Sequence, residues 1–303
     1  MARYATDTIR ASFKLHLEIV MHRALSFRHF LTSILVSLPL VAHASLPEST
    51  NVPGGIAVVV LCSVEACASA PQSWLGEQMV LVTADHNQWV AVVGLALSTK
   101  PGSHELRYKV GEEMKTQVFE VNEKKYPEQH IKLKDKSKVQ LSAADEARAE
   151  REIATIMQLK LHWRAATDTD LAFVLPAEGK LAGRFGLHRF FNGVARAPHV
   201  GLDVAVDSDT PIRASAQGKV LAVGDYFFNG KTIFVDHGNG LITMYCHLNR
   251  IDVQAGTTVS KGQLLGLSGM SGRATGPHLH WSVVLNGAMV DPELFILPVP
   301  EAH

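Results

Sequence analysis

A chain of 303 residues is long enough for about two domains. Its hydrophobic content of 47% and charged content of 19% are those of a globular protein. Because the formal net charge is zero, the sequence gives no reason to expect a long-range attraction to nucleic acid, and we predict no nucleic-acid partner.

Residues 1–44 have the pattern of a secretory signal peptide. Basic residues precede a short apolar run at 30–41, and Ala42-His43-Ala44 follows it. A basic segment, a short apolar core and an Ala-x-Ala site together predict export, here to the periplasm. Residues 1–20 do not fit this pattern, so the true start is expected at Met21. An uncleaved membrane anchor is the alternative, although the apolar run is short for a membrane span.

Residues 45–122 predict a small N-terminal β-sandwich. Short apolar runs alternate with Gly, Pro, Asn and Asp turn residues, with no helical period. The runs expected to form strands are 56–61, 79–83, 89–93 and 118–121.

Three cysteines are present. Cys62 and Cys67 lie close together in the part of the chain that would be exported, where disulfides form. They are expected to form a small disulfide loop or to remain two free thiols. Cys246 is left over and is expected to be buried in a strand.

Residues 123–172 predict a basic linker and a helix. The segment 123–138 is rich in lysine, which indicates either a solvated linker or a patch for an anionic envelope surface. Ser142 and Asp145 have the spacing of a helix start, and apolar residues near helical period predict a helix to about Leu161. This apolar stripe is expected to pack on one of the domains or to bind a partner.

Residues 173–303 are almost wholly β in pattern. Asn239-Gly240 and Asn286-Gly287 are typical of hairpin turns. His237 is placed in the first of these turns and is left out of the predicted site. The runs expected to form strands are 211–214, 219–223, 232–235, 241–245, 263–267 and 281–285.

Histidine and aspartate motifs in this half suggest a metal site. His278 and His280 are two apart at the start of a strand and therefore face the same side. His199 and Asp203 lie four apart with a glycine between them, and His247 offers another imidazole. Two nitrogens, one oxygen and an open position are typical of catalytic zinc, whereas structural zinc is usually closed by four ligands rich in cysteine.

These motifs resemble the lysostaphin-type, LytM-like zinc metallopeptidases, which cut peptide cross-links of bacterial cell walls. The resemblance covers roughly residues 175–295, and the motifs follow the order of the family. The N-terminal half resembles, less specifically, the domain that precedes the peptidase in some proteobacterial members. The matching segments of the peptidase half are 176–179, 183–186, 199–203, 211–214, 218–220, 236–240, 245–248 and 276–280.

The resemblance implies a mainly β fold with a C-terminal antiparallel LytM-type sheet at 173–303. It implies that His199, Asp203 and His280 bind one Zn²⁺, and that His247 and His278 are the catalytic pair that handle the water proton and the tetrahedral oxyanion. All five positions match the family pattern.

The implied activity is a zinc-dependent peptidoglycan endopeptidase whose substrates are cross-link peptides. The expected bond joins D-Ala to meso-diaminopimelate, and glycyl bridges are the runner-up. A non-enzymatic regulator of wall amidases on the same fold is the alternative function, although such relatives usually lack some zinc ligands. We expect a monomer, with an envelope protein as the candidate partner of the N-terminal domain or linker helix.

Overall fold

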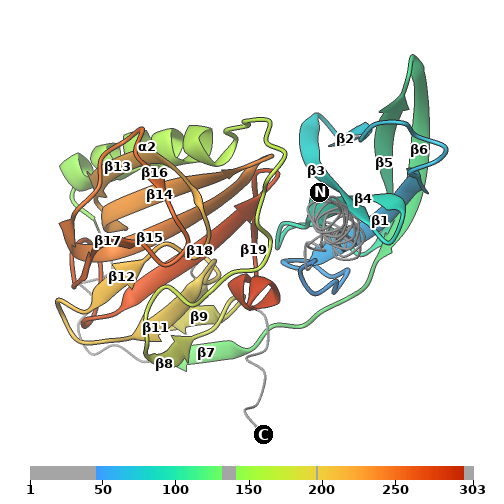
Figure 1. The fold of residues 1–303 in the computed structure, drawn as a ribbon. Helices are drawn as coiled ribbons and strands as arrows, with labels where there is room; N and C mark the ends of the chain where they lie inside the picture. The colour runs from blue at the N-terminus through green and yellow to red at the C-terminus, as the bar shows by residue number, and fades with distance from the viewer. Residues whose placement is uncertain (1–45, 132–140, 196, 297–303) are drawn as a thin grey trace, which may run out of the picture. The chain divides into compact units, whose positions relative to one another are not determined.

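The computed structural model describes residues 46–131, 141–195 and 197–296, so the predicted signal peptide and the part of the lysine-rich linker from residue 132 onward lie outside the described residues. The described part is mainly β, as predicted, with a single α-helix (Figure 1). No helix in the described ranges has the length and apolar character needed to cross a membrane. The elements are β1 (Ile56–Ser63), β2 (Gln72–Leu75), β3 (Gln78–Asp85), β4 (Gln88–Gly94), β5 (Gly102–Val110), β6 (Glu113–Val121), β7 (Glu128–Ile131), α2 (Ala143–Lys160), β8 (Lys180–Gly183), β9 (His188–Phe191), β10 (Val194–Ala195), β11 (Leu202–Ala205), β12 (Pro211–Arg213), β13 (Gly218–Tyr226), β14 (Gly230–Gly238), β15 (Leu241–Ile251), β16 (Thr258–Val259), β17 (Leu264–Ser268), β18 (Leu279–Leu285), β19 (Ala288–Val290) and the 3-10 helix η2 (Pro292–Phe295).

The N-terminal half is an antiparallel β structure of six strands in the order β1-β4-β3-β2-β5-β6. β3 pairs with both β4 and β2, so the strands form one continuous path in place of two separate sheets. Alternate residues of the strands are buried in a common core that includes Val59, Leu61, Leu106 and Phe119. β2 and β5 were not expected from the sequence.

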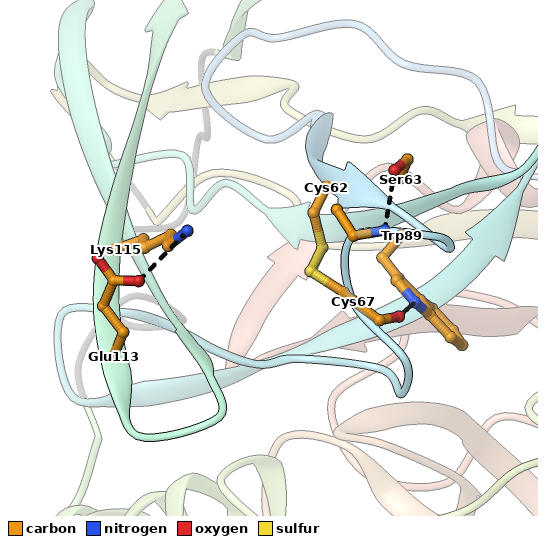
Figure 2. The surroundings of a disulfide bond; sticks show 7 residues. Cys62, Ser63, Cys67, Trp89, Glu113 and Lys115 are labelled. Carbon is orange, nitrogen blue, oxygen red and sulfur yellow. Dashed lines mark hydrogen bonds and ion pairs between the residues drawn. A yellow bond between two sulfur atoms is a disulfide. The ribbon is translucent and has the colours of Figure 1, made fainter.

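Cys62 and Cys67 form a disulfide, which decides between the two predicted states (Figure 2). The loop that they close is also fixed by hydrogen bonds. Trp89 Nε1 donates to the Cys67 carbonyl over 2.9 Å, and the Ala66 amide donates to Ser63 Oγ over 3.1 Å. The third cysteine, Cys246, is buried and free, as predicted.

Helix α2 begins where the sequence predicts, because Ser142 Oγ accepts a hydrogen bond from the Asp145 amide at its N-terminus. The predicted apolar stripe packs on the protein only in part. Ile156 packs against the C-terminal half, but Ile153 and Met157 are 47% and 54% exposed. Glu152 lies on the packed side of the helix, where its carboxylate accepts the Phe227 amide over 2.5 Å. The side of α2 that faces the protein therefore carries a polar contact of Glu152, whereas the apolar pattern alone predicted Ile153 and Met157 on that side.

The C-terminal half is built on an antiparallel sheet whose central path is β16-β13-β14-β15-β18-β11-β8. Successive side chains on a strand face opposite sides, and two clusters of buried residues follow this alternation. On β15, Ile242 and Met244 belong to the cluster that packs against α2, whereas Leu241 and Tyr245 belong to the larger cluster on the other face. Helix α2 lies along the sheet in Figure 1.

The end of β4 meets the hairpin turn between β18 and β19. The Gly94 amide donates to Asn286 Oδ1 over 2.6 Å, and Asn286 Nδ2 donates to the Gly94 carbonyl over 3.1 Å, both in a buried environment. Gly94 has no room for a side chain, because a Cβ would lie 2.6 Å from the Leu285 carbonyl. The buried residues Ile56, Leu81 and Val92 belong to the same hydrophobic cluster as the core of the C-terminal half.

Candidate metal and catalytic site

Two neighbouring strands bring an aspartate and a histidine side by side. Asp203 of β11 is the register partner of His280 of β18. Their sequence neighbours, Leu202 and Leu279, point into the large hydrophobic cluster, so both polar side chains point to the opposite face of the sheet. His199 reaches the same point from the turn before β11.

These three residues place their donor atoms in a small triangle. His199 Nε2 lies 3.0 Å from Asp203 Oδ1 and 3.0 Å from His280 Nδ1, and His280 Nδ1 lies 2.9 Å from Asp203 Oδ1. Metal bonds of about 2.0–2.1 Å in a tetrahedral site imply ligand atoms separated by about 3.3 Å. The His-Asp-His group is therefore close to the size and donor chemistry of a catalytic metal site.

Hydrogen bonds outside the triangle orient its two histidines. His199 Nδ1 lies 3.0 Å from the Arg184 carbonyl, which can only accept, so Nδ1 carries the proton and Nε2 offers its lone pair. His280 Nε2 lies 3.0 Å from Ser282 Oγ, and donation to this hydroxyl leaves Nδ1 free to act as a ligand.

Glycines make room for the triangle. A Cβ at Gly201 would lie 2.6 Å from His280 Cε1, and a Cβ at Gly183 would lie 2.2 Å from Asp203 Oδ2. Any larger residue at either position would have to push a predicted ligand away. The glycine between His199 and Asp203 therefore does more than permit a bend in the chain.

Two further histidines stand beside the triangle. His278 Nε2 lies 3.8 Å from Asp203 Oδ1, and the ring centroids of His247 and His278 are 4.7 Å apart. His247 Nδ1 lies 2.8 Å from the Ser271 carbonyl, and His278 Nδ1 lies 2.9 Å from the Gly276 carbonyl. Both rings are therefore held with Nδ1 protonated, which leaves each Nε2 available for proton exchange.

A bulge in β15 turns His247 toward this group. Regular alternation would place His247 on the same face as Tyr245, away from Cys246. His247 instead has φ +63, and the pairing of β15 with β14 shifts register around it. Leu248 then takes the place in the large hydrophobic cluster, and the His247 ring lies 6.0 Å from that of His280. A left-handed non-glycine residue at this point indicates strain held at a functional site.

Burial and the neighbouring charges shift the pKa values of this group. Burial alone would raise the pKa of Asp203, but the close approach of the His199 and His280 rings outweighs burial and holds the pKa well below its usual value. Burial lowers the pKa of His247 to about 4, and burial also lowers the pKa of His280. An ionised carboxylate beside histidine nitrogens that keep a free lone pair is the arrangement in which a cation is bound.

The structure thus brings together all five residues predicted for the site. The placement of His237 was wrong: it lies in β14 and is 3% exposed, not in a turn. It hydrogen-bonds the Gln217 carbonyl and Thr243, and neither partner belongs to the triangle. The orienting groups Arg184, Ser271 and Ser282 were missed, because two of them act through backbone carbonyls that carry no sequence signal.

Comparison with known proteins gives matches in both halves of the chain. The profile of Peptidase family M23 matches residues 197–292, and that of the Peptidase family M23 N-terminal domain matches residues 49–124. A crystal structure of a candidate M23 peptidase from Pseudomonas aeruginosa is 40% identical, with a TM-score of 0.69. That alignment covers 82% of this chain and 96% of that chain.

Two curated relatives match the peptidase half. Peptidoglycan DD-endopeptidase ShyA of Vibrio cholerae is 42% identical over 95 residues, which are 31% of this chain and 22% of ShyA. DD-carboxypeptidase/endopeptidase Mpg of Neisseria meningitidis is 41% identical over 103 residues, which are 34% of this chain and 24% of Mpg. The chain therefore spans less than a quarter of either curated relative.

Proposed function

This chain belongs to peptidase family M23, and from that membership we propose that it is a zinc-dependent endopeptidase that hydrolyses peptide cross-links of peptidoglycan. The observation that carries the proposal is the triangle of His199, Asp203 and His280, whose three donor atoms lie 2.9–3.0 Å apart. Zinc bound by this triangle would supply a Lewis acid and acidify a water molecule.

The roles of the protein groups follow from which nitrogen each histidine leaves free. His247 and His278 both donate Nδ1–H to a backbone carbonyl. Each Nε2 can then accept the proton of the attacking water or, once protonated, donate to the developing oxyanion and to the leaving amine. The two ring centroids lie only 4.7 Å apart, so we assign the two roles to the pair.

The substrate is proposed from the relatives. ShyA and Mpg are named for DD-endopeptidase and DD-carboxypeptidase/endopeptidase activity. We propose the bond between D-Ala and meso-diaminopimelate, with glycyl bridges as the second bond to test. The predicted signal peptide supports a periplasmic location, which we propose together with a monomeric state.

A regulator of wall amidases on the same fold is the competing function. Such a protein would not need a complete metal and proton-transfer group. The retention of three ligand positions, two further histidines and the glycines that make room for them favours the enzyme.

Mass spectrometry of cross-linked muropeptides tests the proposal. The purified protein is incubated separately with D-Ala–meso-diaminopimelate dimers and with glycyl-bridged dimers. Each substrate is tested without chelator, with chelator, and after zinc is added back to the chelator-treated protein. The proposal expects monomers from the first substrate, loss of release with chelator, and recovery with zinc.

A histidine outside the site provides the matched control. His86→Ala, in the β3–β4 turn, should keep both zinc and activity. A zinc-loaded protein that releases no monomer from any cross-linked fragment would contradict the enzymatic proposal. Stimulation of a wall amidase by that same inert protein would instead favour the regulator.

A further inference from the structure

A turn next to the triangle sets the orientation of His199. The Arg184 carbonyl accepts from His199 Nδ1, the Gly186 amide donates to the His199 carbonyl over 2.8 Å, and the His199 amide donates to the Leu187 carbonyl over 3.0 Å. Three hydrogen bonds thus tie one predicted metal ligand to residues 184–187. Whatever fixes this turn also fixes the direction of His199 Nε2.

Tyr126 of the linker packs directly on this turn. A Cβ built on Gly186 would lie 1.9 Å from Tyr126 Cδ1, so the ring lies against the Gly186 backbone. Gly186 has φ +82, a conformation that other residues rarely adopt. The Tyr126 ring also makes an edge contact with Phe185, with centroids 6.2 Å apart.

The linker continues along the same segment. The His188 amide donates to the Pro127 carbonyl over 3.0 Å, and β7 then pairs in parallel with β9. On its other side, the Tyr126 hydroxyl donates to the Pro53 carbonyl over 2.7 Å. Burial first, and then the charge of Asp291, raise the pKa of Tyr126 to about 12, so the hydroxyl stays a donor.

Arg184 is held from the opposite direction. Its Nη1 donates to Glu293 Oε1 of η2 over 2.7 Å. The turn therefore lies between an ion pair at one end and an aromatic ring at the other. The ion pair is exposed and contributes little, so the ring of Tyr126 is the stronger constraint.

We propose that Tyr126 is a positioning residue for the metal site, because its ring fixes the 184–187 turn and thereby aims His199 at the ion. The inference rests on the proposed function for the presence of zinc. It assigns to the linker, which lies outside the predicted site, a part in metal affinity. Residues that orient metal ligands from outside the ligand sphere typically change metal affinity by about 10–100-fold when they are replaced.

Zinc affinity, measured by competition with a fluorescent chelator, tests the proposal without relying on turnover. Tyr126→Ala should weaken zinc binding by about 10-fold or more, and Tyr126→Leu gives a second variant that keeps apolar volume. Tyr126→Phe keeps the ring and should stay close to wild type. The visible spectrum of the Co²⁺-loaded protein should change in Tyr126→Ala and not in Tyr126→Phe.

Tyr108→Ala is the matched control, since Tyr108 is 7% exposed in the core of the six-stranded half. It should lower the melting temperature of the apoprotein and leave zinc affinity unchanged. Equal zinc affinity in Tyr126→Ala, Tyr126→Leu and wild type would overturn the positioning role of Tyr126 but not the proposed function. A loss of zinc affinity in Tyr108→Ala as large as that in Tyr126→Ala would do the same. A wild-type protein that binds no zinc would overturn the proposed function with it.

Discussion

Acid should destabilise this protein through His237, which is buried in β14. His237 Nδ1 lies 2.7 Å from the Gln217 carbonyl, and Nε2 lies 2.8 Å from Thr243 Oγ1. Because a carbonyl only accepts, Nδ1 carries the proton, and the neutral ring satisfies both partners when Nε2 accepts from the Thr243 hydroxyl. A second proton would have to be held on a ring that is only 3% exposed.

The pKa of His237 gives the size of the effect. Burial lowers the pKa from 6.5 to about 4, although the hydrogen bond to Gln217 and the charges of Asp236 and Asp170 raise it; the charge of Arg164 lowers it further. Since the folded pKa is depressed, the unfolded chain binds the proton first as the pH falls below about 6.5, and stability is lost down to about pH 4. Proton linkage gives a loss of about 2 kcal/mol between pH 7.5 and pH 5, and about 3 kcal/mol by pH 4.

Urea unfolding of the chelator-treated protein at pH 7.5, 6 and 5 measures this loss. His237→Gln removes the titrating group, so its free energy of unfolding should fall by about 2 kcal/mol less than that of wild type over the same range. The other histidines titrate in both proteins and cancel in the comparison. Parallel pH profiles for the two proteins would refute the reasoning.

Three other outcomes are expected. His280→Ala should lose zinc, measured by metal content, whereas His278→Ala should keep zinc and lose most turnover; full activity in either would contradict the assigned roles. Replacing Asn286 by Ala leaves a buried amide and carbonyl without partners and should lower the free energy of unfolding by about 2–4 kcal/mol, which a thermal or urea melt will detect, while an unchanged melt would contradict the buried contact. Replacing both Cys62 and Cys67 by Ala opens a short loop and should cost about 2 kcal/mol in the same measurement, with zinc content as the control that should not move.

The sequence predicts the site better than the elements around it. His278, His280, His199 and Asp203 lie in short motifs with fixed spacing, and strand periodicity correctly places the first two on one face. His247 could not be oriented in this way, because alternation assigns it to the wrong face and only the bulge at φ +63 reverses it.

Some of the missed elements have mixed patterns. β2 and β5 carry polar residues on exposed faces and lack the apolar runs by which β1 and β4 were recognised. On α2, apolar periodicity could not show that Glu152 would take a place on the packed side through a backbone amide. No sequence pattern predicted the contact of Tyr126 with Gly186, which lies 60 residues away in the sequence.

The buried contact of Gly94 with Asn286 affects how the catalytic half can be handled. Ile56, Leu81 and Val92 share one hydrophobic cluster with Leu285 and the rest of β18. A fragment produced by cutting the chain ahead of residue 173 would expose that apolar surface to solvent and to other copies of itself. Recombinant work on this protein should therefore keep both halves in one polypeptide, since the isolated C-terminal piece is expected to aggregate.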